Sequence, residues 1–415
     1  MENRRSFVIR NALGIAAAGI SSAPAASDQF VVGFIGTGVR AIGALIPQFK
    51  FNPAFRIAAL CDVCQPNLEK AATLVGGKAD TYSDYRRVLD RQDIDVVVIA
   101  TPDHWHCPLL IEACEAGKDA YLEKPVSNDI DMCLKAVAAV RKHNRVVQVG
   151  LMQRSSAPFL EAYKVIQSGI LGNIRHVALV SPYGAGGRGP GGNRTATPTA
   201  PPPGLDWDMF QGPAPRRPYS SERQFGWREY WEYGGGALSD WGVHLLDIAH
   251  WYLGVAALPQ TAAAAFGWFN RPQDERVPDT TEVSWLYPNF VASYSSRYDV
   301  RGTYFWGDDG VLSVNRDGFR VRPVSEGRRG PSGKPLFEEK AVALHDEPGN
   351  GQASFESDCG RHILNFLACL RSRGRPVCDI ETGAFSTIPT LMGGLSIRNG
   401  GKTVAWDGRG ARLLS

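Results

Sequence analysis

The chain has 415 residues, of which 44% are hydrophobic and 21% are charged, and 45 Lys and Arg residues against 42 Asp and Glu residues give a formal net charge of +3. This composition is that of a globular protein long enough for two or three domains. Because the charges nearly balance and no long basic run occurs, we expect no nucleic-acid partner. Beyond residue 27, no stretch reaches the roughly 18 apolar residues needed to span a bilayer.

Residues 1–27 predict an export signal. Arg4 and Arg5 precede a short apolar stretch, and Ala23-Pro24-Ala25 follows it. This order is typical of a signal peptide, and the paired arginines in Arg-Arg-Ser-Phe resemble a twin-arginine signal, which exports folded proteins. We therefore expect the protein in the periplasm or elsewhere outside the cytoplasm. The alternative is a basic, Ala-rich tail on a cytoplasmic protein.

Residues 28–151 predict a doubly wound α/β domain of the Rossmann type. Short apolar, β-branched runs alternate with helical stretches, and the runs are apolar on both faces, as in a parallel sheet covered on each side. The expected strands are 29–36, 55–62, 94–101, 119–123 and 146–150. The expected helices lie near 40–50, 65–75, 105–117 and 129–143.

Residues 152–415 predict a second domain that is α+β with an open, mainly antiparallel sheet. A helix from 155 leads to a strand at 174–180, and the Gly-, Pro- and Thr-rich stretch 184–204 predicts a loop or insertion. Asn, Pro and Gly turns separate further strand-like runs at 261–269, 282–287, 290–298 and 310–314. A last helix is expected near 361–370.

The eight cysteines are too sparse for a disulfide scaffold and are interpreted as buried free thiols. Cys61 and Cys64 have CxxC spacing, and His104, His106 and Cys107 could complete a zinc site. Because both clusters end neighbouring predicted strands that have other roles, we expect no metal.

A glycine-rich turn follows the first predicted strand and opens a helix, with the pattern G-x-G-x-x-A in Gly36-Thr37-Gly38-Val39-Arg40-Ala41. The glycines allow a tight turn and bring the backbone close to a pyrophosphate at the helix N-terminus. Asp62 ends the next strand, where a carboxylate accepts from both ribose hydroxyls and repels a 2′-phosphate, so we expect NAD rather than NADP. The alternative is a glycine turn in a sheet that holds another ligand.

Two further stretches fall at strand carboxyl ends, where ligands bind in such sheets. They supply five residues expected at the cofactor: Thr101, Pro102, His106, Glu123 and Lys124. The proline after Lys124 biases this lysine away from helix. Beside a cationic nicotinamide, a lysine can take part in proton transfer. The alternative is a solvated surface lysine.

The densest signal is the stretch 227–244, in which three glycines precede a predicted helix over 237–253. In that helix Asp240 and His244 are four residues apart and lie on one face, and Asp247 and Trp251 lie farther along the same face. A carboxylate beside a histidine can hold its tautomer and stabilise the imidazolium, which makes a competent base. The alternative is a helix capped by Asp240 with His244 satisfied in a core.

Together these motifs resemble the Gfo/Idh/MocA oxidoreductase family, which includes glucose-fructose oxidoreductase and inositol dehydrogenase. The resemblance covers nearly the whole chain after the signal. It implies a Rossmann domain followed by an α/β domain whose open sheet often forms oligomer contacts, so we expect a homo-oligomer. By motif, Lys124, Asp240 and His244 match the family's catalytic lysine, aspartate and histidine, with His244 as the acid/base.

Other matches to the family are looser. Arg154 follows the strand that ends at Gly150, where the family often has a residue near cofactor or substrate, and we expect Arg154 and Trp231 among the substrate contacts. The stretch 205–208 resembles a branch with twin-arginine signals. Many members of that branch have His-Leu-Gly-Asn near the C-terminus, whereas this chain has Leu391-Met392-Gly393-Gly394.

The implied activity is NAD(P)-dependent oxidation of a secondary alcohol of a sugar, polyol or glycoside. An exported enzyme meets little free NAD, so we expect a tightly bound cofactor and a closed redox cycle. One alternative is an NAD-dependent glycosidase or epimerase that works by transient oxidation. Another is a non-catalytic sugar-binding protein on the same scaffold, which would not require this acid/base set.

Overall fold

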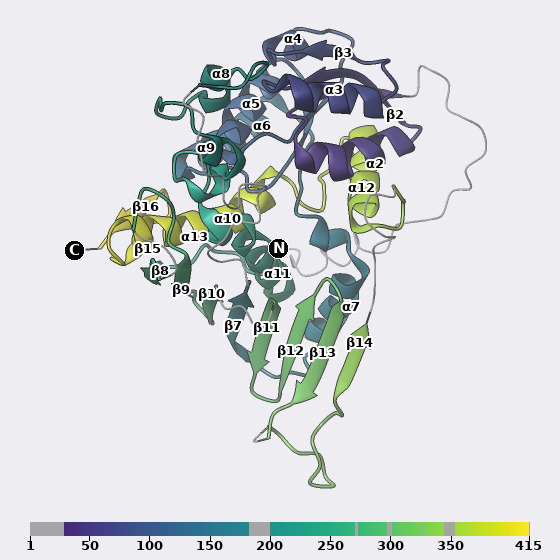
Figure 1. Cartoon of the computed structure of the whole chain (residues 1–415). Helices are drawn as coiled ribbons and strands as arrows, with labels where there is room; N and C mark the ends of the chain where they lie inside the picture. Colours follow the sequence, from purple (N-terminus) through teal and green to yellow (C-terminus); the bar gives the residue numbers. More distant parts are fainter. Residues whose placement is uncertain are drawn as a thin grey trace.

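A parallel sheet of six strands forms the N-terminal part of the protein (Figure 1). The computed structural model describes residues 29–181, 200–269, 273–296, 301–325, 327–343 and 353–414. The expected export signal and most of the predicted loop at 184–204 therefore lie outside the described residues. The strands are β1 (Phe30–Ile35), β2 (Phe55–Cys61), β3 (Asp80–Tyr82), β4 (Val96–Ile99), β5 (Asp119–Leu122) and β6 (Val147–Val149).

The strand order is β3-β2-β1-β4-β5-β6, and every neighbouring pair is parallel. Strands β4 and β5 are buried throughout, as their apolar sequences predict. The order in which successive strands are added to the sheet reverses between β1 and β4, and the carboxyl ends of these two strands border the crevice where ligands bind in such sheets. The predicted Rossmann fold is confirmed.

Helices cover both faces of this sheet: α2 (Ile46–Phe51) after a π-helical turn η2 (Ala41–Leu45), α3 (Gln65–Leu74), α4 (Arg86–Leu89), α5 (Asp103–Glu115) and α6 (Ile130–His143). Local chemistry sets their ends. The Asp129 side chain accepts from the backbone N–H of Met132 and caps α6, and Asn144 ends it in the left-handed conformation, with φ of 51°.

A helix from far along the chain completes the core of the first sheet. Helix α12 (Asp358–Ser372) lies beside α2 (Figure 1), and its buried Ile363 and Phe366 belong to the same apolar cluster as Phe49 and Tyr121. The ring centroids of Tyr121 and Phe366 are 6.0 Å apart. Part of the chain that follows residue 152 therefore packs as a layer of the Rossmann fold.

The second sheet has ten strands in the order β14-β13-β12-β11-β7-β10-β9-β8-β15-β16. They are β7 (Ile174–Val180), β8 (Thr261–Gly267), β9 (Thr280–Leu286), β10 (Val291–Ser295), β11 (Gly302–Gly307), β12 (Gly310–Asn315), β13 (Gly318–Pro323), β14 (Lys340–Ala343), β15 (Val404–Trp406) and β16 (Ala411–Leu413). Only β7 and β10 pair in parallel among the named strands, so the predicted mainly antiparallel sheet is confirmed.

One face of this sheet is covered by helices α7 (Ala157–Gln167), α11 (Gly242–Leu253) and α13 (Ile380–Arg398). Burial alternates along β9, where Val283 and Trp285 are buried while Glu282 and Leu286 are exposed. The face that carries Leu286 is the open one.

The predicted single helix over 237–253 is wrong. The chain forms α10 (Gly236–Asp240) and α11, which are separated at Trp241. The break changes the surroundings of Asp240 and His244, as described below. Within the described ranges, no helix is long and apolar enough to cross a membrane.

Candidate active site

A cavity of about 1140 Å³ opens at the carboxyl edge of the first sheet, between that edge and the segments that precede α11. It exceeds the roughly 300–1,000 Å³ of a site for one drug-sized ligand. Its wall contains the glycine turn after β1 and the residues that follow β2, β4 and β5, together with His244 from the second domain. The two predicted groups of functional residues therefore meet at one cavity.

The glycine turn presents its backbone to this cavity. Gly36 has φ of +89°, and a Cβ atom there would lie 2.7 Å from the carbonyl of Ala100. A Cβ at Gly38 would meet nothing within 4 Å, and Gly38 and the 89% exposed Val39 line the cavity. The turn thus has the open space that a pyrophosphate beside a helix N-terminus needs.

Asp62 lies at the end of β2 in the same wall. The backbone N–H and the hydroxyl of Thr37 donate to its Oδ2 at 2.7 and 3.1 Å, and the N–H of Cys64 donates to Oδ1 at 2.8 Å. Burial raises the pKa of Asp62, and these hydrogen bonds oppose that rise. Thr37 is fully buried and does not line the cavity, so it holds Asp62 in place rather than facing a ligand.

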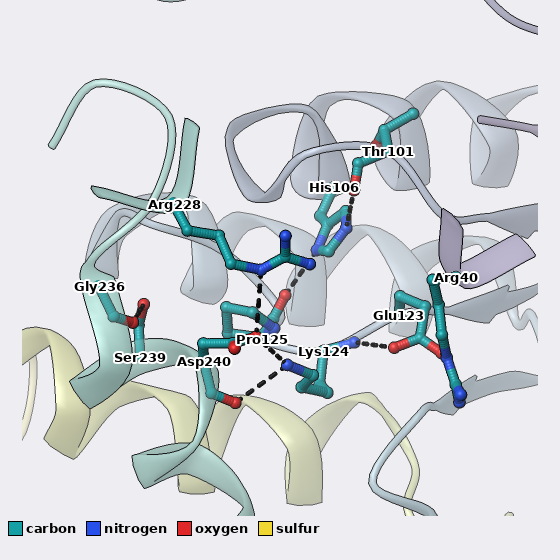
Figure 2. A network of polar contacts seen from close by, with 10 residues as sticks. All are labelled: Arg40, Thr101, His106, Glu123, Lys124, Pro125, Arg228, Gly236, Ser239 and Asp240. Atoms are coloured by element: carbon teal, nitrogen blue, oxygen red, sulfur yellow. Dashed lines mark hydrogen bonds and ion pairs between the residues drawn. The ribbon is translucent and has the colours of Figure 1, made fainter. Parts of the chain in front are cut away.

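Arg40 and Glu123 form an ion pair across the cavity wall, with 2.7 Å between Nε and Oε1 (Figure 2). Burial favours the neutral form of Glu123, but Arg40 and Lys124 outweigh it and hold the Glu123 pKa below its usual value. Gly150 makes room for this carboxylate, because a Cβ there would lie 3.0 Å from Oε1.

His106 joins the turns after β4 and β5. Its Nδ1 lies 2.6 Å from the carbonyl oxygen of Pro125 and its Nε2 lies 3.0 Å from that of Thr101 (Figure 2). Thr101, Pro102 and His106, which are expected at the cofactor, all line the cavity. Because the ring nitrogens face backbone oxygens, His106 has no nitrogen left for a metal. In the part of the chain that the structure describes, no group of three or more potential metal ligands occurs.

Lys124 and Asp240 form the central ion pair of the cavity (Figure 2). Lys124 Nζ lies 2.5 Å from Asp240 Oδ1 and 2.9 Å from the Asp240 carbonyl oxygen, and Arg228 Nε lies 3.3 Å from the same Oδ1. Burial alone would raise the pKa of Asp240, but Lys124 and Arg228 lower it far below its usual value. Asp240 therefore holds the lysine, and the predicted pairing of Asp240 with His244 is replaced by this contact.

His244 lies in the first turn of α11, is 5% exposed and lines the cavity. Its Nδ1 has no hydrogen-bond partner within the described ranges. Burial, followed by the charges of Lys124 and Arg316, lowers its pKa well below the ordinary value. The imidazole is therefore neutral at physiological pH, which is the form a general base requires.

Two expected substrate contacts lie elsewhere. Arg154 forms a bidentate ion pair with Asp247 at 2.7 and 2.9 Å, lies over the ring of Trp251, and does not line the cavity. Trp231 lines a separate, small cavity and packs against Gly394. Arg154 thus connects the turn after β6 to α11, one turn beyond His244, and the prediction that it contacts substrate is not supported by the geometry.

The Arg154–Asp247 pair yields a stability prediction. The two side chains are 12% and 1% exposed, so Arg154→Leu leaves a buried carboxylate uncompensated and should lower the free energy of unfolding by about 3–5 kcal/mol. Urea denaturation measures this loss. The double variant Arg154→Leu/Asp247→Leu should recover most of it; equal stability of wild type and the single variant would contradict the structural role.

The cavity residues that the motifs did not single out include Asp103, Arg228, Trp241 and Arg316. Asp103 and Arg228 lie in stretches that were singled out for other residues: Asp103 is next to Thr101 and Pro102, and Arg228 belongs to the stretch 227–244. The guanidinium groups of Arg301 and Arg316 both contact the Trp241 ring, with their Cζ atoms 4.5 and 4.9 Å from its centroid. No motif indicates Arg316, which lies in the turn between β12 and β13 and lines the cavity beside Trp241.

Family models agree with this architecture. An "Oxidoreductase family, NAD-binding Rossmann fold" model of the Gfo/Idh/MocA family matches residues 30–151, and two models of the family's C-terminal domain match 156–261 and 209–315. Together these matches cover more than half of the chain. The chain belongs to the Gfo/Idh/MocA oxidoreductase family. Its glycine turn, Lys124, Asp240 and His244 fall within the matched ranges.

Individual relatives of this Gfo/Idh/MocA protein match over shorter stretches. It is 33% identical over 162 residues to "Uncharacterized oxidoreductase YrbE" of Bacillus subtilis, which covers 37% of this chain and 45% of that one. It is 29% identical over 157 residues to a "Glycosyl hydrolase family 109 protein" of Shewanella baltica, covering 36% and 34%. The matches thus span less than half the length of these relatives.

Solved structures share the fold over nearly the whole Gfo/Idh/MocA chain. Aldose-aldose oxidoreductase from Caulobacter crescentus has a TM-score of 0.66 at 20% identity and covers 91% of this chain and 100% of that one. Levoglucosan dehydrogenase, solved with NADH and levoglucosan, has a TM-score of 0.64 at 20% identity, with coverages of 91% and 99%. At these identities the likeness establishes the fold.

Proposed function

We propose that this protein is an NAD-dependent oxidoreductase that acts on a secondary alcohol of a sugar, polyol or glycoside. The observation that carries the proposal is the meeting of Lys124, Asp240 and His244 in the wall of the cavity that also contains Gly38 and Asp62. A dinucleotide fits the glycine turn and the Asp62 carboxylate. The same carboxylate disfavours a 2′-phosphate, so NADP is the less suitable cofactor.

Each residue has a defined part in this chemistry. The nicotinamide, when bound, accepts a hydride from the carbon that bears the alcohol. His244 takes the hydroxyl proton, because its buried imidazole is neutral. The Lys124 ammonium, held by Asp240, donates a hydrogen bond to the substrate oxygen and stabilises negative charge on it. The Trp227, Tyr230 and Trp241 rings at the cavity offer apolar faces for a sugar.

The names of similar proteins support the substrate class. Levoglucosan dehydrogenase, an aldose-aldose oxidoreductase and a myo-inositol dehydrogenase of Lactobacillus casei solved with NAD(H) and myo-inositol all share this fold. The deciding experiment mixes the purified protein with a panel of sugars, polyols and glycosides and follows the absorbance of the reduced cofactor. Failure of every compound to change that absorbance, in protein shown to hold NAD, would contradict the proposal.

A glycosidase that oxidises its substrate transiently is a second candidate, because several relatives are described as glycosyl hydrolase family 109 proteins. It would use the same lysine, aspartate and histidine. Release of free sugar from an aryl glycoside without net formation of NADH would favour this candidate over a plain dehydrogenase. A non-catalytic sugar-binding protein would show neither reaction.

Cofactor retention is part of the proposal, and a segment that we call the strap, residues 204–212, supports it. The strap contains α8 (Trp207–Gln211), and Gly204 O accepts from the backbone N–H of Gln65 at 2.7 Å next to the end of β2. At its other end Phe210 O accepts from the Trp105 indole at 3.0 Å, on α5. Leu205, Met209 and Phe210 line the cavity, so the strap crosses the nucleotide side of the opening.

We expect NAD(H) to copurify with the protein, and Gly212→Ala to release it. Gly212 has φ of +50°, and a Cβ there would lie 2.0 Å from the Trp105 ring, so the variant displaces the strap. Gly169→Ala is the matched control, since its φ is +72° but a Cβ meets nothing within 4 Å. Denatured extracts are assayed for nicotinamide. Equal cofactor content in both variants would contradict a role of the strap in retention.

We further propose export in the folded state and a homo-oligomer. Retention by the strap would let an exported enzyme carry its cofactor with it. The open face of the second sheet exposes Leu286, Val291 and Trp306 by 39–45%, which suits contact with a second copy. Light scattering of the purified protein tests the oligomer, and cell fractionation tests the location.

A further inference from the structure

Asp103 is a buried carboxyl group in the cavity wall to which the proposed reaction assigns no task. It begins α5 directly after Thr101 and Pro102, is 4% exposed, and lines the same cavity as Lys124 and His244. Within the described ranges it forms no hydrogen bond or ion pair. A buried carboxylate without partners is unfavourable, so this group must carry a proton or face a cationic ligand.

Four charged groups from three elements surround Asp103. Lys124 and Glu123 follow β5, Arg228 belongs to η4 (Trp227–Glu229), and Asp240 ends α10. Both cations already contact Asp240. Burial raises the pKa of Asp103 to about 8, with the cations opposing and the anions reinforcing that rise. On its own helix, His104 and His106 bond to backbone oxygens.

The reaction needs a place for the proton that leaves the alcohol. His244 can accept this proton, but it cannot keep it, because the imidazole is buried and acted on by Lys124 and Arg316. Lys124 is engaged with Asp240. Asp103 is the remaining acidic group that lies within the electrostatic range of Lys124 and lines the cavity without a partner in the described chain.

We propose that Asp103 stores the substrate proton: it is ionised while the oxidised dinucleotide is bound and protonated while the reduced form is bound. This inference rests on the proposed function. The oxidised nicotinamide ring is a cation and the reduced ring is neutral, so only the oxidised form stabilises a nearby carboxylate. Per turnover, one C–H and one O–H bond of the alcohol break and a C=O bond forms. The hydride with its electron pair passes to the dinucleotide, and the proton forms an O–H bond on Asp103, so the charge of the cavity stays constant.

The consequence is a second proton taken up on reduction of the bound cofactor. In solution, NAD reduction consumes two electrons and one proton, so at a fixed ambient potential the ratio of oxidised to reduced cofactor rises tenfold per pH unit. With Asp103 taking up another proton, the ratio should rise about a hundredfold per pH unit at pH values below about 8, where Asp103 is ionised beside the oxidised ring and protonated beside the reduced one. The additional tenfold corresponds to ~30 mV per pH unit for a two-electron couple.

The test equilibrates the holoprotein with a redox mediator at fixed potential and measures the bound ratio by absorbance at several pH values, without substrate. Wild type should give the hundredfold slope and Asp103→Asn the tenfold slope, whereas Asp103→Glu, which keeps a carboxyl group, should restore the hundredfold slope. Glu222→Gln is the matched control, since Glu222 also lines the cavity but is exposed, and it should keep the wild-type slope.

Two outcomes would overturn the inference. One is a tenfold slope in wild type. The other is a hundredfold slope that persists in Asp103→Asn and disappears in His244→Gln, because the proton would then reside on the histidine. Failure of the proposed function itself looks different: the protein would hold no NAD(H), or would hold it and oxidise none of the tested compounds, and neither result depends on the slope.

Discussion

His244→Ala should abolish hydride transfer while leaving cofactor binding intact. The imidazole is the neutral base of the cavity, and loss of a positioned general base costs about 10²–10⁴-fold in rate. Its Nδ1 has no hydrogen-bond partner in the described chain, so the substitution breaks no hydrogen bond at that nitrogen. Single-turnover reduction of the bound NAD by a substrate from the panel measures the effect, and nicotinamide content measures binding.

The control for this variant is His143→Ala, at the end of α6 and outside the cavity, which should react at the wild-type rate. His244→Gln preserves most of the side-chain volume and should be as slow as His244→Ala. A variant that keeps full turnover would remove His244 from the mechanism. A variant that loses NAD together with activity would indicate damage to the fold rather than to catalysis.

Lys124→Met should slow the reaction by about 10²–10³-fold, the cost of removing one preorganised donor from a developing negative charge. Its effect should fall on kcat, because the hydrogen bond to the substrate oxygen strengthens as charge develops. Methionine keeps the length of the side chain, and Arg228 remains 3.3 Å from Asp240, so the carboxylate keeps one cationic partner. Steady-state kinetics with a substrate from the panel separates kcat from KM.

Lys135→Met, on the exposed side of α6, is the matched control and should leave both constants unchanged. If Lys124→Met raised KM alone, the lysine would bind substrate without stabilising the transition state. Such a result would leave the base role of His244 untouched and would reassign only Lys124.

The sequence predicted the Rossmann domain well because its strands are short, apolar runs between glycine turns and amphipathic helices. It missed α13, although this helix has 19 residues. Gly383, Pro389, Gly393 and Gly394 lie inside it, and these residue types disfavour helix. Nearly every turn of α13 is buried, so no polar face creates a period to detect. Packing against the rest of the protein stabilises this helix, and a local sequence pattern carries no information about that packing.

The site was predictable where residues follow a strand and unpredictable where a contact depends on the second domain. Asp62, Lys124 and His244, which their motifs singled out, all line the cavity. The pairing of Asp240 with His244 was predicted wrongly, because a spacing of four residues does not show the helix break at Trp241. The sequence did not indicate the contact between Arg154 and Asp247, because Asp247 lies on α11, 93 residues farther along the chain.

Helix α12 limits how this chain can be divided. A fragment ending near residue 151 would contain all six parallel strands, yet it would leave the apolar patch around Phe49 and Tyr121 facing water where Ile363 and Phe366 now cover it. Such a fragment should be insoluble or bind partners indiscriminately. Chimeras that exchange the nucleotide domain between relatives must therefore carry α12 with it, so the natural unit of exchange is discontinuous in the gene.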